Sequence, residues 1–424
     1  MKTVFFGGRV VCPVTGRDEE ADVLVEGSQI AAVGGIDLDG VDAEKVDCSG
    51  LVVCPGFVDL EPEICDPGMT WREDLVSAGH AAARGGFTTL LASPRTDPVL
   101  DDPAVVREVL DRAAEAACVQ VLISGALTKS LGGEDIAEVG LLVEAGASAL
   151  SNSGVHIQST TVLRNALLYA RPFGKTVMLR VGDPWLDQVG VVNEGDVSTG
   201  MGLRGISDAS EEIGLSRLVA LARVTGARVH ATRISTAKGV QVLRRAREEG
   251  VDISGSTGAT YLLLNELDVL ESGYDTAFKL SPPLRTEADR LALVEAVRDG
   301  VITAVCSQHV PWTRVEKELE FEQAEPGAVG LETALSATVA GLGDLKAAIN
   351  ALSAGPASVL GIRNAIEPGA HANLVVLDPG AEWTADPSQF ASKNGYTPLA
   401  GRTLPVLVKR TICLGEAVHM EQTG

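Results

Sequence analysis

Residues 51–60 read LVVCPGFVDL and run into DLEPEICDPG at 59–68. The first stretch is an apolar, β-branched run of the kind that forms a buried strand. It opens a series of similar runs, which continues with FTTLLAS (87–93), VQVLIS (119–124), ASALSNS (147–153), TVMLRV (176–181), RVHATRIS (228–235), VDISGST (251–257) and ITAVCSQ (302–308). Helical segments that end in Gly, such as 208–226 and 286–300, lie between them. Eight strands with intervening helices predict an α/β fold, a (β/α)8 TIM-type barrel whose chemistry lies at the C-terminal strand ends.

The two ends of the chain have a different pattern from the middle. Short β-type runs separated by turns fill residues 3–35 and return at 372–418. We expect these ends to pair into one small, discontinuous β-sandwich domain. The predicted division is 1–54 and 360–424 for the small domain, with the barrel at 55–359.

The composition limits the classes of function. The chain has 424 residues, with 35 Lys and Arg against 57 Asp and Glu, so its net charge is -22. This charge disfavours binding to nucleic acid. Seven scattered cysteines indicate reduced thiols, and no run approaches the ~20 apolar residues of a membrane span. We therefore expect a cytoplasmic protein that binds neither nucleic acid nor membrane.

Four motifs connect the chain to a known family. They are PGFVDL (55–60), ISTAKGV (234–240), SPPLR (281–285) and GLET (330–333). Their order and spacing resemble the amidohydrolase superfamily, and the dihydroorotase family most closely, over practically the whole chain. The resemblance implies a TIM-type barrel and a metal-dependent hydrolase of cyclic amides in pyrimidine synthesis.

The metal positions of that family hold unusual residues here. The family's first barrel strand ends in Asp-x-His-x-His-x-Arg-x-Pro-Gly, and in DLEPEICDPG the histidine positions are Glu61 and Glu63, with Cys65 at the arginine. By the same resemblance, Arg180 and Arg233 stand at two further metal-binding histidines. Arginine stays protonated and has no free lone pair, so it is not an ordinary metal ligand.

Other positions that carry chemistry in the family are also changed. Gln308 replaces the aspartate that shuttles a proton, and an amide does not titrate near neutral pH. His309 beside it matches the family, but without metal and base we expect a buried structural histidine. The remaining altered positions are Arg95, Asn152, Ser153 and Ser281.

These changes predict a pseudo-enzyme that has lost catalysis and zinc, and so has no cofactor. The resemblance then implies a structural subunit that helps the catalytic chain of aspartate transcarbamoylase assemble in de novo pyrimidine (UMP) biosynthesis. A homodimer within a larger hetero-oligomer would suit that role.

Two other interpretations remain open. One is an active amidohydrolase with an altered mononuclear metal site built on Glu61, Glu63 and His309. The other is a metal-free sensor, in which Arg95, Arg180 and Arg233 bind an anionic metabolite. Against the sensor, we expect Glu61 and Glu63 to pair with Arg180 and Arg233 and to fill the vacated metal site with ion pairs.

Overall fold

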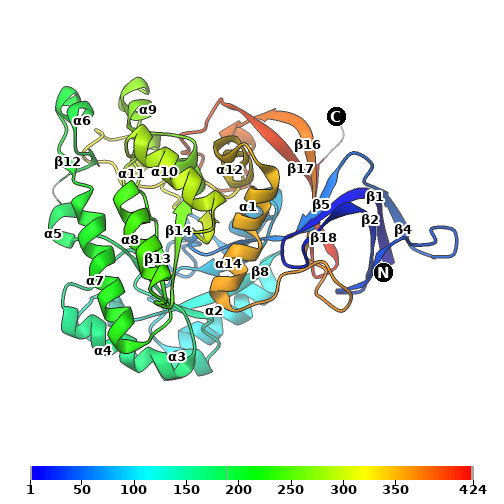
Figure 1. Ribbon diagram of the computed structural model, residues 1–424, viewed down its shortest axis with the longest axis horizontal. Helices are drawn as coiled ribbons and strands as arrows, with labels where there is room; N and C mark the ends of the chain where they lie inside the picture. The colour runs from blue at the N-terminus through cyan, green and yellow to red at the C-terminus, as the bar shows by residue number, and fades with distance from the viewer. Residues whose placement is uncertain (1, 189, 422–424) are drawn as a thin grey trace.

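A computed structural model describes residues 2–188 and 190–421, and its larger part is a nearly closed parallel barrel (Figure 1). The strands follow one another around the sheet in chain order. They are β6 (Phe57–Asp59), β7 (Phe87–Ala92), β8 (Gln120–Ala126), β9 (Ala149–Ser151), β10 (Val177–Arg180), β13 (Val229–Thr232), β14 (Ile253–Gly258) and β15 (Ala304–Cys306). At the seam, the Ser307 backbone N–H donates to Asp59 at 3.0 Å, which joins the last strand end to the first. The predicted TIM-type barrel is confirmed.

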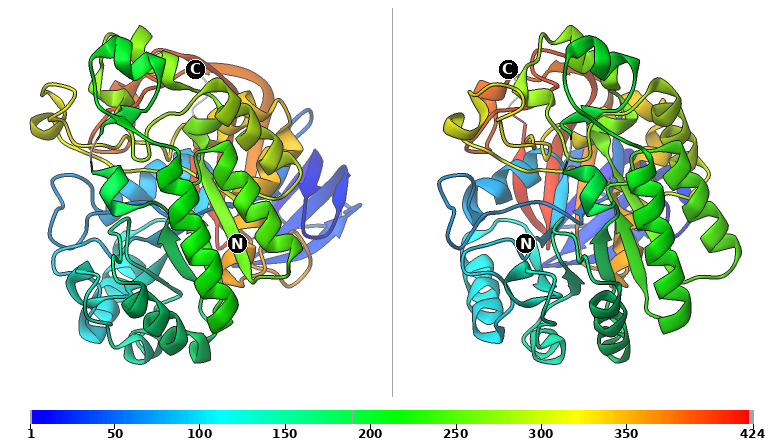
Figure 2. Two further views of the ribbon diagram at one scale, coloured as in Figure 1. Left: turned by 60° about the vertical axis from the view of Figure 1, so that its left-hand side comes forward. Right: turned by 90° about the vertical axis from the view of Figure 1, so that its left-hand side faces the viewer.

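Helices cover the outside of the barrel, and α7 and α8 run side by side there (Figures 1 and 2). The covering helices are α1 (Leu75–Arg84), α2 (Pro103–Ala116), α3 (Val139–Glu144), α4 (Thr160–Ala170), α7 (Ala209–Thr225), α8 (Ala237–Glu248), α10 (Glu287–Arg298), α12 (Ala334–Leu342), α13 (Leu345–Leu352) and α14 (Ala354–Leu360). Their ends follow from local side chains. Asp74 and Ser77 form a capping box at the start of α1, and Gly226 ends α7 in the left-handed conformation.

Short elements extend from the C-terminal strand ends, and α6 and α9 project farthest from the barrel (Figure 1). The short helices and strands are α5 (Pro184–Asp187), β11 (Val192–Asn193), α6 (Asp196–Met201), β12 (Gly205–Ile206), α9 (Glu266–Glu271) and α11 (Arg314–Lys317). Single 3-10 turns are η1 (Lys129–Leu131), η2 (Arg171–Phe173), η3 (Ala259–Leu262), η4 (Thr276–Phe278) and η5 (Pro387–Gln389).

The two ends of the chain pair beside the barrel, as predicted, and the domain that they form is one mixed sheet (Figure 1). Its strands are β1 (Lys2–Cys12), β2 (Arg17–Glu26), β3 (Gln29–Gly34), β4 (Glu44–Asp47), β5 (Val52–Pro55), β16 (Leu374–Thr384), β17 (Thr403–Cys413) and β18 (Glu416–Met420). The order is β18-β17-β16-β5-β1-β2-β3, with β4 also on β1. Strand β5 joins the ends, because it pairs parallel with β1 and antiparallel with β16.

The opening stretch LVVCPGFVDL is two strands, not the single strand that its apolar run predicts. Its first half is β5 in the end sheet and its second half is β6 in the barrel. Gly56 separates them, and a Cβ at this residue would lie 2.1 Å from the Thr88 hydroxyl oxygen. Only glycine lets the chain pass this close to β7 as it changes sheets.

Two further features of the structure are the state of the thiols and the character of the helices. All seven cysteines are free, and six of them are buried. Among the described residues, every helix is too short or too polar to cross a membrane.

Candidate functional site

The barrel fold brings the altered family positions together at one mouth, because they follow the C-terminal ends of neighbouring strands. The backbone there is strained at four non-glycine residues with positive φ: Cys65 (62°), Ser153 (44°), Arg233 (59°) and Gln308 (52°). Such conformations cost about 1–3 kcal/mol each and cluster at functional sites.

Glu61 and Arg233 form an ion pair, as the sequence predicts. The Arg233 Nε atom lies 3.4 Å from Glu61 Oε1, and both side chains are mostly buried. Arg233 also donates through Nη1 to the Ser281 carbonyl at 3.2 Å. Burial raises the pKa of the Glu61 carboxyl group, although the Arg233 charge opposes the shift. Within the described part of the chain, Glu61 Oε2 has no hydrogen-bond partner.

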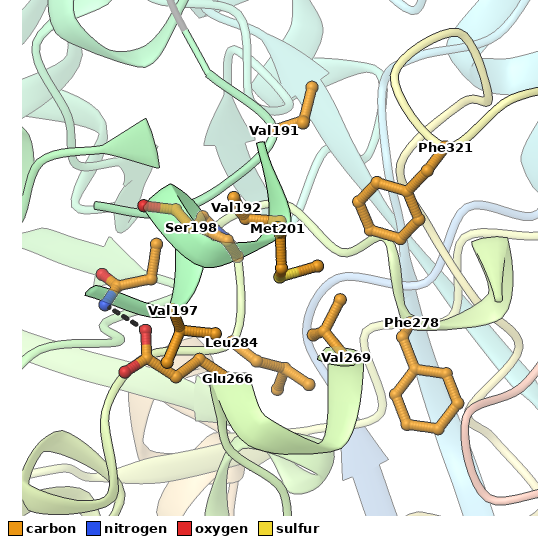
Figure 3. Close-up of a pocket in the computed structure, with 12 residues that line it drawn as sticks. Val191, Val192, Val197, Ser198, Met201, Glu266, Val269, Phe278, Leu284 and Phe321 are labelled. Carbon is orange, nitrogen blue, oxygen red and sulfur yellow. Dashed lines mark hydrogen bonds between the residues drawn. The ribbon is translucent and has the colours of Figure 1, made fainter. Parts of the chain in front are cut away.

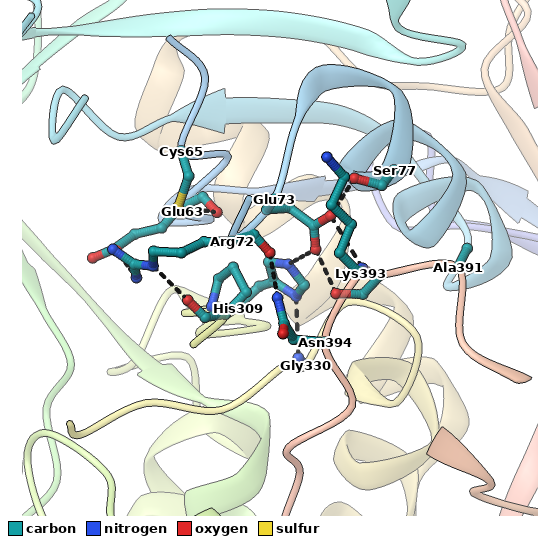
Figure 4. Close-up of polar contacts among 12 residues, drawn as sticks. Glu63, Cys65, Arg72, Glu73, Ser77, His309, Gly330, Ala391, Lys393 and Asn394 are labelled. Carbon is teal, nitrogen blue, oxygen red and sulfur yellow. Dashed lines mark hydrogen bonds and ion pairs between the residues drawn. The ribbon is translucent and has the colours of Figure 1, made fainter. Parts of the chain in front are cut away.

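Glu63 pairs differently from the prediction (Figure 4). Its carboxylate lies 3.1 Å from Arg72 Nη2 and 3.4 Å from Arg95 Nη1. The Arg72 guanidinium also stacks on Trp312, with its carbon 3.6 Å from the ring centroid. Pairing of Glu63 with Arg180 or Arg233 is therefore wrong, because loop residues next to the strand end reach Glu63 first.

Arg180 turns toward the short helix that follows its own strand. Its Nη2 atom donates to Asp187 Oδ2 at 3.2 Å, and the same carboxylate contacts His156 Nε2 at 3.0 Å and Ser210 Oγ at 2.5 Å. Burial lowers the pKa of Arg180. The Asp187 charge opposes this shift, and the nearby Arg233 charge adds to it. Asp187 is a site residue that the sequence analysis missed, because α5 has only four residues and no family motif.

His309 is buried, as expected, and its polar atoms are paired (Figure 4). Its Nε2 atom lies 3.1 Å from Glu73, and the Gly330 N–H donates to its Nδ1 atom at 3.3 Å. Glu73 also accepts hydrogen bonds from Ser77 and Ser392. This network ties the barrel to the chain near residue 392, and Glu73 is a site residue that the sequence analysis missed.

The other predicted positions are mainly structural. Asn152 accepts from Thr128 Oγ1 at 2.6 Å and donates to the Leu131 and Val155 carbonyls. Ser153 contacts the Ser93 hydroxyl at 2.5 Å. Burial raises the pKa of the Cys65 thiol to about 12, so it is not a nucleophile at neutral pH.

A small polar cavity lies at the centre of the mouth. Glu61 and Arg233 line it together with Ser93, Ser124, Ser151 and Ser153. It has room for about one water molecule. The Gln308 amide nitrogen and the Arg180 and Arg233 Nε atoms, also at strand ends, have no hydrogen-bond partner within residues 2–188 and 190–421. This half of the mouth is thus incompletely paired.

A separate apolar pocket lies under the projecting helices α6 and α9 (Figure 3). Met201, Val269 and Phe321 line it, and a hydrogen bond of 2.7 Å from Asn193 to Glu266 closes one side. No altered family position lies in its lining.

The residues at the mouth do not fit the two-metal ligand set of the resembled family. Glu61 and Glu63 have oxygen ligands, but both carboxylates face arginines instead of each other. Arg180 and Arg233 would repel a divalent cation. In the described ranges, no three His, Cys, Asp or Glu side chains form a group that could hold a metal ion.

Comparison with solved structures first identifies the class of fold. The structure is similar to L-hydantoinase (dihydropyrimidinase) from Arthrobacter aurescens, with a TM-score of 0.87 and 23% identity over 99% of this chain and 96% of that chain. A similar match to dihydropyrimidinase from Brevibacillus agri has a TM-score of 0.85 and 22% identity over 99% of this chain and 95% of that chain. The fold is therefore the barrel fold of these two enzymes.

The sequence then gives the family. The model of the "Dihydro-orotase-like" family matches residues 50–239. Dihydroorotase from Anaeromyxobacter dehalogenans strain 2CP-C is 39% identical over 99% of both chains. Dihydroorotase from Pelotomaculum thermopropionicum is 38% identical over 100% of this chain and 99% of that protein. The chain belongs to the dihydroorotase family.

These relatives correct two expectations. Full-length relatives at 36–39% identity carry the name dihydroorotase, which points to an active cyclic-amide hydrolase, so the prediction of a non-enzyme is wrong. The same relatives contradict the prediction that no cofactor is used, because membership of this family implies a metal-dependent hydrolase. Both errors came from judging activity by the replaced ligand positions alone.

Proposed function

We propose that this protein hydrolyses a cyclic amide of the dihydroorotate type at the barrel mouth, with an altered set of site residues. The observation that carries the proposal is the 39% identity to a dihydroorotase over 99% of both chains. The mouth of the barrel is also where enzymes of this architecture hold their reacting groups.

Glu61 is the general base in this proposal. Glu61 lines the cavity that has room for one water, and its Oε2 atom has no hydrogen-bond partner in the described residues. Burial raises the pKa of this carboxyl group. A carboxylate whose pKa is raised toward neutrality is a better proton acceptor at working pH. Oε2 takes a proton from the water, and the water oxygen then attacks the amide carbonyl carbon.

Arg233 stabilises the oxygen that becomes negative in this step. Its guanidinium lines the same cavity and lies against Glu61. When the C–N bond of the ring breaks, the proton held by Glu61 passes to the leaving nitrogen. The product is a single ring-opened molecule: the water oxygen is in its new carboxyl group, one water proton is on the freed nitrogen, and the other is released when the carboxyl group ionises.

The test uses the purified full chain with dihydroorotate, hydantoin and dihydrouracil as substrates, and measures its metal content in the same preparation. We expect ring opening of at least one of these cyclic amides. If none is opened under any metal loading, the proposed hydrolase function fails.

We also propose that the protein associates with the catalytic chain of aspartate transcarbamoylase, as a homodimer within a larger assembly. The family resemblance supports this, as do the net charge of -22 and two exposed tryptophans near the mouth, Trp71 (62% exposed) in a turn and Trp185 (68%) in α5. Exposed aromatic side chains are typical of interface centres.

Mass measurement of the two purified proteins, alone and mixed, tests the association. A complex heavier than either protein, weakened by Trp185→Ser, would agree with it. Unchanged masses at micromolar concentrations of both proteins would contradict it.

A further inference from the structure

A second cavity lies at the opposite end of the barrel from the mouth. Its volume is about 160 Å³, larger than the cavity that holds Glu61 and Arg233. The walls are Val58, Thr89, Gln120 and Leu122 from three neighbouring strands, and a cover from the segment 362–373. This segment connects α14 to β16, so the cavity lies between the barrel and the end sheet.

The strand side of the cavity is more polar than a barrel interior requires. Thr89 pairs in register with Val58 on one side and with Gln120 on the other, so the three side chains share one face of the sheet. Branched apolar residues dominate the interior of TIM-type barrels. Thr89 is only 5% exposed, and it lines the cavity.

The cover fixes which polar atoms remain available. Asn373 donates to Gln120 Oε1 at 2.8 Å, so the Gln120 Nε2 donors are left without a partner in the part of the chain described. Asn364 donates to the Gly56 carbonyl at 2.8 Å, and its Oδ1 acceptor has no partner among the described residues. The cavity therefore offers an amide donor, an amide acceptor and a hydroxyl. Arg363 and His371 also line it, but both are exposed, and the Arg363 charge is paired with Glu367.

The size and shape of the cavity limit the ligand. A cavity of about 150 Å³ accommodates a benzene-sized ring. Val58, Leu122 and Ala365 supply apolar walls, and Ile362 at 39% exposure lies where solvent can reach. A ring with apolar faces and an edge that carries both N–H and C=O groups complements these walls and polar atoms.

We propose that this cavity between the barrel and the end sheet, the lower cavity, binds an uncharged single-ring molecule with amide or ureide groups along its edge. Gln120 donates to a ring carbonyl, Asn364 accepts from a ring N–H, and Thr89 does either. The site is separate from the proposed hydrolytic site. A bound ring would connect the first barrel strands to the segment 362–373 and stabilise the contact between the barrel and the end sheet.

Calorimetric titration of the full chain with uracil tests the proposal, because uracil is an uncharged ring of this class. We expect binding that Thr89→Val and Gln120→Met each weaken about tenfold, the effect of one lost hydrogen bond of about 1.4 kcal/mol. Thr88→Val is the matched control. Its hydroxyl lies next to Gly56 and it does not line the cavity, so uracil should bind this variant normally.

Binding at the mouth is the alternative that must be separated. Glu61→Gln changes the mouth and leaves the lower cavity intact, so we expect uracil affinity to survive this substitution. Loss of binding in Glu61→Gln with none in Thr89→Val would place uracil at the mouth and overturn the proposal. Absence of any uracil binding to the unmodified protein would overturn it too.

Discussion

The two halves of the barrel mouth differ in how completely their buried polar atoms are paired. Around His309, Glu73 accepts from Ser77 and Ser392, and both ring nitrogens of the histidine have partners. Around Arg233, the Glu61 Oε2 and Arg233 Nε atoms lack hydrogen bonds in the described structure. A fully paired network makes a rigid wall, whereas a partly paired one retains groups for water or substrate.

The largest expected effect lies in the paired half. Glu73→Ala removes a fully buried carboxylate and leaves His309, Ser77 and Ser392 without it. We expect a loss of about 3–5 kcal/mol in the free energy of unfolding. Chemical denaturation measures this, with the exposed Glu248→Gln as control. A loss below about 1 kcal/mol would mean that this half is not held by its network.

The next effect concerns pH in the other half. His230, on the strand that leads to Arg233, is fully buried, and burial lowers its pKa to about 3. In the unfolded chain His230 takes up a proton as the pH falls through about 6.5, whereas in the folded chain it stays neutral until the pH approaches 3. Stability from this group is therefore complete above pH 6.5 and lost as pH falls, by about 2 kcal/mol between pH 7 and pH 5.

Denaturation at both pH values, on the natural protein and on His230→Asn, measures this contribution. The variant should lose about 2 kcal/mol less than the natural protein over the same interval. An equal loss in both proteins would show that His230 takes up its proton in the folded state.

The smallest effect tests the boundary between the halves, where Arg72 stacks on Trp312. Trp312→Phe keeps a ring beside Arg72 but removes the hydrogen bond of 3.1 Å from the indole to the Pro326 carbonyl. We expect about 1 kcal/mol of destabilisation in thermal or chemical unfolding. Trp71→Phe, at a side chain 62% exposed, is the control and should change little. Equal effects of the two substitutions would contradict this account.

The sequence predicts the barrel well, because each apolar strand run is bounded by glycine and polar residues. It misses the break at Gly56, since the close approach to Thr88 exists only once the two sheets are packed. The sequence also predicts that the altered family positions meet at one mouth, because the C-terminal strand ends meet in any barrel of this kind. The partners of Glu63 and Arg180 were not predictable, because Arg72 and Asp187 come from segments whose path no local pattern sets.

The direct test of the central claim is the rate of dihydroorotate hydrolysis by the natural protein and by Glu61→Gln, with metal content measured for both. The substitution keeps the size of the side chain and removes its ability to accept a proton. We expect turnover by the natural protein and a fall of about 10²-fold or more in kcat for the variant, at matched metal content. Equal rates in the two proteins would contradict the role of Glu61, and the base would have to be sought elsewhere at the mouth.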